Sequence, residues 1–358
     1  MRDTISEKRA RVDDRRAAGL LPERFKSPVY MMWEITYSCP LRCVHCYNSS
    51  GYSPPRHLGH DDAMKVAEQI ADAEVMSICL TGGEPNLHPA YYDASRVLKE
   101  AGVSIGTPTS GWNMTPETAD VYVELFDTVQ VSVDAGRAET HDAIRGRNRS
   151  FQRAMAALRM LNDAVERSKS HKTPNLCLAY VANRRNIDEF VELTDQVADI
   201  SRLTEIRLQA QVPSGRAREL GLGLTDADLE RLQQLAIRQT LKHGILVNAG
   251  DPTGHLKKAV LGWPWEYAVI DPYGDVRFSP WLPGRMGNVL ESSLQEVWDA
   301  GLGDLHRDPD MVELLSRIRT VNDIGDVTEE LESRYGSFGG GDARARRDGA
   351  PVVGSAAH

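Results

Sequence analysis

The sequence predicts an α/β fold of six strand–helix units followed by a smaller C-terminal α+β region. Three observations support this prediction. From Val29 onward, short β-rich runs alternate with helical segments, which is typical of a parallel sheet. Two of the runs alternate polar with apolar residues, which indicates a sheet with one wet face. After Val212, a turn-rich link leads into a different pattern, which ends the strand–helix alternation.

The six predicted strands are runs rich in β-branched residues, each followed by a helical segment or a turn. They are 29–36, 75–81, 103–109, 128–134, 176–181 and 203–212. The helical segments between them are 60–73, 89–101, 115–125, 150–166 and 187–200. The first of these helices begins with the cap candidates Asp61 and Asp62. Six units fit either an open doubly wound sheet or a partial barrel, and periodicity alone does not separate the two.

The fourth and sixth predicted strands have a polar face. In the sixth, Glu205, Arg207 and Gln209 alternate with apolar residues, and in the fourth Gln130 and Ser132 do so. A parallel strand buried on both faces is normally apolar throughout. The polar faces therefore predict that the inside of the sheet lines a wet pocket, as in a barrel with an open mouth. The alternative for the sixth strand is an edge position with a solvated face.

Outside the six units, the chain divides into three further parts. Residues 1–28 form a charged, helix-prone arm, and 29–224 form the core. The region 225–338 contains a helix at 226–242, a hairpin of 267–270 and 275–278, and helices at 291–300 and 310–333. Residues 339–358 are rich in Gly and polar residues and predict a disordered tail.

Composition excludes several classes of protein. The chain of 358 residues has 41% apolar and 26% charged residues and a formal charge of −9, which argues against a nucleic-acid binder. No stretch approaches the roughly 20 apolar residues that span a bilayer. The N-terminus lacks the apolar core of a secretory signal. We therefore expect a cytoplasmic protein without a membrane or nucleic-acid partner.

Three of the five cysteines lie within eight residues, directly after the first strand. Cys39, Cys43 and Cys46 have the spacing C-x3-C-x2-C. Three thiolates on one loop can ligate three irons of a [4Fe–4S] cluster and leave the fourth iron open for a cofactor or substrate. A structural zinc site is the alternative, but it needs a fourth ligand and usually has paired C-x-x-C spacing. The other two cysteines lie inside predicted strands as buried thiols.

This cysteine loop resembles the signature of the radical S-adenosylmethionine (SAM) superfamily. One unit later, Gly82, Gly83, Glu84 and Pro85 resemble the family motif for the amino group of the methionine moiety. A glycine pair allows close backbone approach, and a carboxylate suits an ammonium group. The resemblance implies a partial (β/α)6 TIM-like barrel, one [4Fe–4S] cluster and bound S-adenosylmethionine.

Further cofactor contacts are expected from the order and spacing of three weaker motifs along the chain. The stretch Thr109–Gly111 resembles the family's T-N-G element, with Ser110 in place of Asn. Ser132 and Asp134 resemble a pair that contacts the cofactor ribose or methionine. Arg145 resembles an arginine that meets the cofactor carboxylate, and we add His45 of the cysteine loop. The family chemistry implies that the reduced cluster cleaves the sulfonium and yields a 5′-deoxyadenosyl radical, which abstracts hydrogen from substrate.

The C-terminal region resembles the SPASM and twitch extensions of this superfamily. Those extensions normally carry auxiliary clusters on several cysteines, but Ser279 stands where a cluster cysteine is expected and no cysteine follows Cys177. We therefore predict a degenerate extension and a single cluster. A single cluster favours reactions in which no electron has to leave an oxidised product through a second cluster, such as epimerisation, elimination or decarboxylation.

The first function hypothesis is modification of a small polar intermediate in natural-product or antibiotic biosynthesis, such as a sugar, an aminoglycoside or a nucleoside sugar acid. The alternative is maturation of a ribosomally synthesised peptide, and a non-catalytic scaffold is a third hypothesis. The expected substrate-side residues are Glu34, Arg207, Gln209 and Trp281. An electron donor such as flavodoxin or ferredoxin is the expected protein partner.

Overall fold

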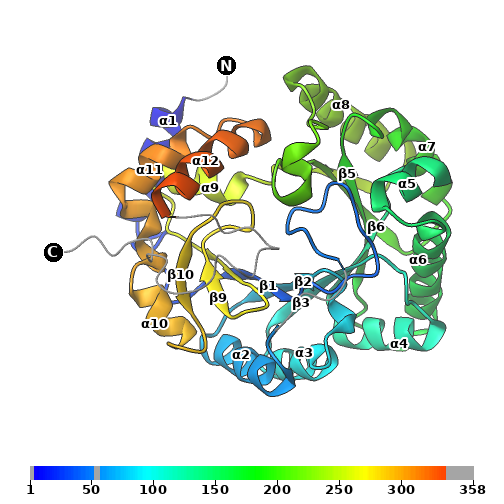
Figure 1. The fold of residues 1–358 in the computed structure, drawn as a ribbon, viewed down its shortest axis with the longest axis horizontal. Coiled ribbons are helices and arrows are strands. Elements are labelled where there is room, and N and C mark those ends of the chain that lie inside the picture. The colour runs from blue at the N-terminus through cyan, green and yellow to red at the C-terminus, as the bar shows by residue number, and fades with distance from the viewer. Residues whose placement is uncertain (1–3, 52–56, 336–358) are drawn as a thin grey trace.

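The computed structural model describes residues 4–51 and 57–335, and one ten-stranded sheet runs through them. Its strand order is β10-β9-β8-β1-β2-β3-β4-β5-β6-β7. The sheet curves around a central space and its ends do not pair, so the barrel stays open (Figure 1). Figure 1 also shows the helices on the outer side of this curved sheet. This architecture is the predicted partial barrel.

The six central strands are mutually parallel and lie next to one another in chain order. They are β1 (Tyr30–Thr36), β2 (Ser77–Gly82), β3 (Ser104–Thr109), β4 (Thr128–Ser132), β5 (Asn175–Ala182) and β6 (Leu203–Ala210). The helices between them are α2 (His60–Asp72), α3 (Tyr91–Glu100), α4 (Pro116–Leu125), α5 (Ala138–Arg145), α6 (Ser150–Arg167) and α7 (Phe190–Val197). Because all six strands are parallel, the loops after them meet at one end of the barrel.

β4 and β6 each have one buried and one accessible face, as predicted. In β6, Ile206 and Leu208 are 1% exposed, whereas Arg207 is half-buried and Gln209 is exposed. Arg207 donates a 3.1 Å hydrogen bond to Gln130 of β4, so the two polar faces meet inside the barrel. β6 pairs with β5 on one side and β7 on the other, which makes the edge-strand alternative wrong.

The C-terminal region adds four strands to the same sheet. β7 (Leu246–Ala249) pairs with β6, and β8 (Tyr267–Ile270) pairs in parallel with β1. β9 (Asp275–Arg277) completes the predicted hairpin with β8, and β10 (Arg285–Asn288) follows it. The sequence reasoning did not find β7, β10, α5 or α9 (Gly254–Val260), which are short elements of four to eight residues.

The helix predicted over 310–333 is two helices, α11 (Pro309–Ser316) and α12 (Ile324–Tyr335). Between them, Thr320 has an extended backbone and caps a short 3-10 turn, and its backbone N–H donates to the Asp323 carboxylate at 2.8 Å. This reciprocal capping begins a new helix and interrupts the apolar periodicity that predicted one. The helices at 226–242 and 291–300 are confirmed as α8 (Asp226–His243) and α10 (Leu294–Asp299).

The N-terminal arm forms α1 (Ile5–Ala17), where Val12 is buried and Arg16 donates to the carbonyl of Gly262. α8 begins close to the boundary predicted after residue 224, although the division into domains stays a prediction. The predicted tail 339–358 lies outside the described residues. In the described part of the chain, no helix is both long enough and apolar enough to cross a membrane.

Candidate active site

The cysteine loop follows β1 and lies at the end of the barrel where the strands end. Backbone hydrogen bonds hold it on both sides. Val44 donates to the carbonyl of Ile144 at the end of α5, at 2.8 Å. Arg216, in the 3-10 turn after β6 (Gly215–Glu219), donates its backbone N–H to the Cys46 carbonyl at 3.1 Å. The loop is therefore fixed between the segments that follow β4 and β6.

Cys43 is buried, and Cys39 and Cys46 are half-buried. Burial raises the pKa of the Cys43 thiol to about 11, and burial likewise raises the pKa of Cys39, with the nearby cysteines adding to the shift. Within the described ranges, no three His, Cys, Asp or Glu side chains converge closely enough to hold a metal ion. Three sulfurs on one loop nevertheless match the donor set of a [4Fe–4S] cluster, and iron binding would displace the thiol protons.

A buried ion pair lies against Cys43. The Arg145 Nε lies 2.6 Å from Asp134 Oδ2, and another Arg145 nitrogen donates to the Cys43 sulfur at 3.8 Å. Burial by itself would raise the pKa of Asp134, but Arg145, two nearby histidines and a backbone hydrogen bond together outweigh it, so this pKa lies below its usual value. The other Asp134 oxygen accepts the Val181 N–H at 2.9 Å. Oδ2 has this ion-pair contact with Arg145 but accepts no hydrogen bond from the described residues.

His45 lies on the same side, with Nε2 3.4 Å from Asp134 Oδ2. Burial lowers the pKa of His45 to about 4, so its ring is neutral. Its Nδ1 is buried and has no hydrogen-bond partner among the described residues. A buried polar atom left without a partner is costly, and this atom fits a ligand that supplies one.

Glu84, after β2, is buried to 1% exposure and accepts hydrogen bonds without a cation. The Thr109 hydroxyl donates to Oε1 at 2.5 Å, the Ser110 N–H donates to Oε2 at 2.9 Å, and the Ser110 hydroxyl also donates to Oε2. Burial raises the pKa of this carboxyl group. No Lys, Arg or His of the described chain lies within ion-pairing distance of Glu84, so the corner fits a ligand ammonium group.

The two glycines before Glu84 allow β2 to touch the start of the cysteine loop. A Cβ at Gly82, where φ is 138°, would overlap the Thr36 carbonyl oxygen, and one at Gly83 would overlap that of Ser38. Gly83 N–H donates to the Thr36 carbonyl at 2.7 Å. Pro85 is buried and begins a short 3-10 turn. Close packing against the cysteine loop therefore explains the two glycines of the Gly-Gly-Glu-Pro stretch, in addition to its expected binding role.

Glu34 of β1 is fully buried and belongs to a network that sequence reasoning missed. It forms an ion pair with Arg277 of β9, which comes 243 residues later. It also accepts hydrogen bonds from the Tyr37 hydroxyl at 3.1 Å and from Asn48 Nδ2 at 3.0 Å. Asn48 Oδ1 in turn accepts from the Cys46 sulfur at 3.1 Å. Glu34 therefore joins the C-terminal region to the cysteine loop.

Of the two residues that join Glu34 in this network from other segments, the sequence gave a signal for Asn48 and none for Arg277. Asn48 lies two residues after Cys46, so its place on the loop was visible. Arg277 had no local signal, because β9 reaches β1 only through β8.

The other predicted site residues spread over the barrel. Arg207 lies 3.1 Å from Glu205 and contacts Gln130, while Gln209 is exposed nearer the end of β6. Ser132 is half-buried in β4. The indole of Trp281 donates to the Pro252 carbonyl at 2.8 Å, and its ring packs edge-on against the ring of Tyr47, with centroids 4.9 Å apart. Trp281 therefore lies beside the cysteine loop, whereas Arg207 lies deeper along β6.

Comparison with known proteins places this geometry in a family. Residues 33–197 match the model of the radical SAM superfamily. The mycofactocin maturase MftC of Mycolicibacterium smegmatis is 30% identical over 292 residues, which cover 76% of this chain and 70% of that protein. The AdoMet-dependent heme synthase of Methanosarcina barkeri is 26% identical, with coverage of 76% and 82%. The sporulation killing factor maturation protein SkfB of Bacillus subtilis is 28% identical, with coverage of 75% and 64%.

Among solved structures, SuiB of Streptococcus suis bound to S-adenosylmethionine has a similar fold. The TM-score is 0.65 at 14% sequence identity, over 86% of this chain and 72% of that one. The predicted partial barrel is thereby matched by a known fold. On the similarity to MftC and the family match, the chain belongs to the radical SAM superfamily, whose members use a [4Fe–4S] cluster and S-adenosylmethionine.

Proposed function

We propose that this protein modifies a ribosomally synthesised peptide by radical SAM chemistry. Two of the relatives reported above are named for maturation, MftC and SkfB. The sequence favoured a small polar metabolite, with peptide maturation as the alternative; the relatives favour the alternative. They lend no support to a sugar, an aminoglycoside or a nucleoside substrate.

The observation that carries the enzymatic part of the proposal is that Glu84 lies against the start of the cysteine loop, where its N–H donates to the Ser38 carbonyl at 2.9 Å. In this proposal, Cys39, Cys43 and Cys46 hold the cluster, and Glu84 accepts hydrogen bonds from the methionine ammonium group. When bound, the cluster and S-adenosylmethionine supply a carbon radical that can abstract a hydrogen atom. The raised pKa of Glu84 supports this role, because a buried carboxyl group without a cation gains most from one.

The surrounding residues position the loop and exclude water. The Arg145–Asp134 pair places a fixed positive group beside Cys43, and hydrogen bonds and charges near the sulfurs tune such clusters. Ser110 orients Glu84 through its N–H and hydroxyl. His45 has a free buried Nδ1 for the cofactor. We assign Asp134 to positioning Arg145, because its Oδ2 lies 2.6 Å from the guanidinium Nε. We keep the predicted cofactor contact of Asp134 as part of the proposal, since this Oδ2 accepts no hydrogen bond from the described residues.

The substrate side of the proposal uses the accessible inner face of the barrel. Arg207, Gln209 and Ser132 line that face, and Trp281 lies at its end beside Tyr47. We keep these residues as proposed substrate contacts. We assign Glu34 a positioning role because it is buried and paired with Arg277, an arrangement that suits a link between regions better than proton transfer.

A single cluster remains part of the proposal. Ser279 is fully buried, its hydroxyl lies 3.1 Å from His255 Nε2, and it accepts the Trp281 N–H at 3.2 Å. Hydrogen bonds therefore occupy the position where a cluster cysteine was expected. A single cluster favours a redox-neutral reaction. Epimerisation, elimination and decarboxylation all meet this condition.

A small-molecule substrate is the second candidate, and one relative favours it. The heme synthase is named for a small-molecule product, and this chain covers 82% of its length. The polar inner faces of β4 and β6 suit a small polar ligand as well as a peptide backbone.

The test is the production of 5′-deoxyadenosine by the anaerobically reconstituted and chemically reduced protein. The peptide fraction and the small-molecule fraction of a host extract are compared, with Cys43→Ala as the blank and Cys79→Ala as a cysteine control. Stimulation by the peptide fraction, absent in Cys43→Ala and retained in Cys79→Ala, is expected. Stimulation by the small-molecule fraction alone would overturn peptide maturation in favour of the second candidate.

A further inference from the structure

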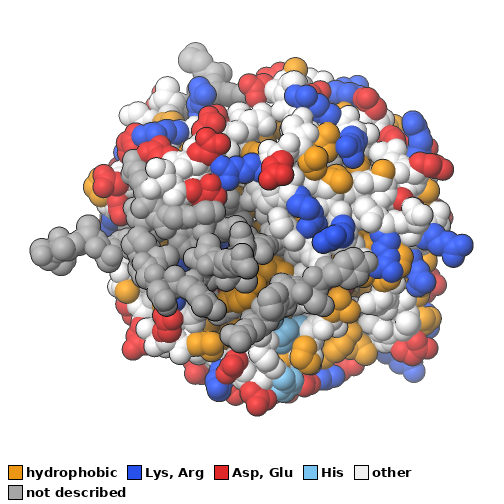
Figure 2. Space-filling model, viewed as in Figure 1, with side chains coloured by type: hydrophobic (Ala, Val, Ile, Leu, Met, Phe, Trp, Pro, Cys, Tyr) orange, Lys and Arg blue, Asp and Glu red, His pale blue; other side chains and the backbone are white. Residues whose placement is uncertain are grey.

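Three arginines beside the cysteine loop have no carboxylate partner. Arg147, Arg149 and Arg153 follow α5 and begin α6, and in the described part of the chain none of them lies within ion-pairing distance of Asp or Glu. Further along the same helix, Arg159 and Arg167 do form such pairs, with Asp199 at 3.1 Å and Asp120 at 2.8 Å. We call Arg147, Arg149, Arg153 and the ring of Trp112 the arginine face. Figure 2 shows Lys and Arg side chains gathered over the edge where Figure 1 places α5 and α6.

Two of the three arginines of the arginine face are held against Trp112, and one of them contacts the cysteine loop. The Arg147 guanidinium stacks on Trp112, 3.8 Å from the ring centroid, and also donates to the carbonyl of Pro40 at 2.5 Å. Pro40 is covalently bonded to Cys39. Arg153 lies 5.4 Å from the same ring and donates to the Trp112 carbonyl at 3.4 Å. Stacked arginine and tryptophan side chains lose little entropy on binding, and both are enriched at binding hot spots.

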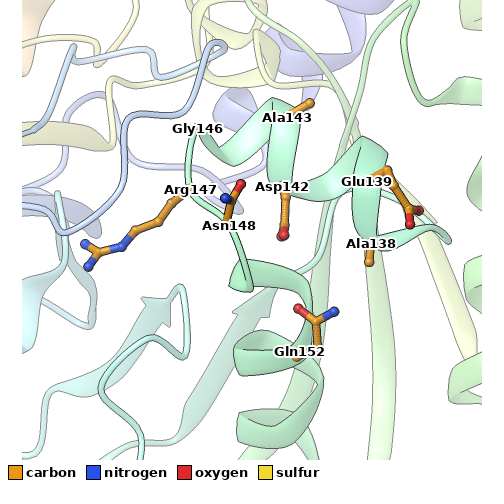
Figure 3. A pocket seen from close by; sticks show the side chains of 8 residues that line it. All are labelled: Ala138, Glu139, Asp142, Ala143, Gly146, Arg147, Asn148 and Gln152. Atoms are coloured by element: carbon orange, nitrogen blue, oxygen red, sulfur yellow. The ribbon is translucent and has the colours of Figure 1, made fainter.

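The neighbouring acidic groups do not neutralise this face. These acidic groups and Arg147 line a hollow of about 780 Å³. In Figure 3, the Arg147 side chain extends to one side, away from Glu139 and Asp142. The Asp142 carboxylate is occupied at the start of α6, where it accepts the N–H groups of Arg149 and Phe151 at 2.6 and 2.9 Å. Arg147, the arginine that lines the hollow, therefore extends toward the cysteine loop and away from the two carboxylates.

The local charge contrasts with that of the whole chain. The formal charge is −9, so the molecule as a whole repels an acidic protein. An unpaired basic patch on such a surface steers an acidic partner to one place. Here that place is the outer side of the loop that carries Cys39 and Cys43.

We propose that the arginine face docks a small acidic electron-transfer protein that reduces the cluster. This inference rests on the proposed function, because it takes Cys39, Cys43 and Cys46 as cluster ligands. The partner, carrying a reduced flavin or iron–sulfur centre, gives up one electron and is oxidised by one electron, while the cluster is reduced by one. Arg147 connects the face to the loop, since it donates a hydrogen bond to the carbonyl of Pro40, the residue next to the proposed cluster ligand Cys39.

The test measures cluster reduction directly, in the full chain reconstituted with its cluster. Reduced flavodoxin is mixed anaerobically with the wild type and with the double variant Arg149→Asn/Arg153→Glu, and bleaching of the cluster absorbance is followed by stopped flow. Asn suits position 149, where φ is 67°. The matched control is Arg238→Glu on α8, an exposed arginine that donates a hydrogen bond to the uncharged Gln234. Dithionite replaces flavodoxin in a parallel series.

We expect the double variant to be reduced by flavodoxin about tenfold more slowly at low ionic strength, with the difference shrinking as salt is added. Reduction by dithionite and the behaviour of Arg238→Glu should match the wild type. Equal flavodoxin rates in the double variant and wild type would overturn the docking proposal. So would an unchanged flavodoxin rate with weakened binding of an acidic peptide substrate. A wild type that holds no reducible cluster would overturn the proposed function itself, which the dithionite series reveals independently.

Discussion

Glu34 and Glu84 lie near the ends of neighbouring strands, are both buried, and have opposite surroundings. Glu34 has a guanidinium, a phenol and an amide as donors, and its cation comes from β9. Glu84 has hydroxyl and amide donors and no cation among the described residues. A buried carboxylate is stable only when its charge is compensated, so the first is complete within the chain and the second fits a cationic ligand. The comparison separates a structural carboxylate from a binding one.

The largest expected effect comes from removing the cation of Glu34. We expect Arg277→Met to lower the free energy of unfolding by about 3–5 kcal/mol, because it leaves a buried carboxylate without a counter-charge. The matched control is Arg96→Met, which breaks an exposed pair with Asp93 and should cost about 0–1 kcal/mol. Denaturant unfolding of both variants checks this. Equal losses in the two variants would mean that the Glu34 pair is no more important than a surface pair.

Glu84→Gln should affect binding and spare the fold. It removes the charge that we assign to the methionine ammonium, so S-adenosylmethionine should bind about 10- to 100-fold more weakly, as expected for the loss of a charged hydrogen bond. Because no internal cation loses its partner, the free energy of unfolding should not fall as it does in Arg277→Met. Anaerobic calorimetric titration gives the dissociation constant. Unchanged affinity would refute the assignment of Glu84, and Glu139→Gln controls for loss of a surface charge.

His255 extends the comparison to a half-buried base that forms no ion pair with a described residue. Burial lowers its pKa to about 3, whereas an unfolded His titrates near 6.5. Between these values the unfolded chain binds one more proton, so stability rises with pH through this window and is lost as pH falls below about 6.5. The slope due to this group is about 1.4 kcal/mol per pH unit. Stability measured at pH 5 to 7 should therefore fall less steeply in His255→Asn than in the wild type, and parallel curves would contradict the assignment.

The smallest expected effect is at Asp142, a half-buried carboxylate whose partners are N–H and O–H groups at the start of α6. It accepts from Arg149, Ser150 and Phe151. We expect Asp142→Ala to lower the free energy of unfolding by about 1 kcal/mol, the usual loss for a helix cap. Thermal unfolding beside Arg277→Met measures it. A loss as large as that of Arg277→Met would show that burial does not decide the ranking of these carboxylates.

The sequence predicted the six central strands and most helices because their signals are local. β1 to β6 fall within the predicted runs or within one residue of them, and the alternation in β4 and β6 correctly indicated an accessible inner face. Prediction failed where elements are short, as in β7 and β10, since four residues carry too little periodicity. It also failed where a cap divides a regular apolar pattern, as at Thr320.

For the site, residues that act within one loop or strand end were found from the sequence. The spacing of Cys39, Cys43 and Cys46, and the pattern Gly82–Glu84, are local, so the family and its cofactors followed from them. Asp134 and Arg145 were also found, but as separate cofactor contacts. Their pairing with each other depends on how the segment after β4 folds back, which motif order does not specify.

The sequence by itself determined the family, the cofactors and the wet inner face of the barrel, because each depends on residue type and short spacing. Only the tertiary structure decided which buried carboxylate already has a cation. Arg277 reaches Glu34 because β8 returns to pair with β1 and brings β9 beside the barrel. A contact across 243 residues has no periodic signal, because it depends on which strand of the C-terminal region pairs with β1.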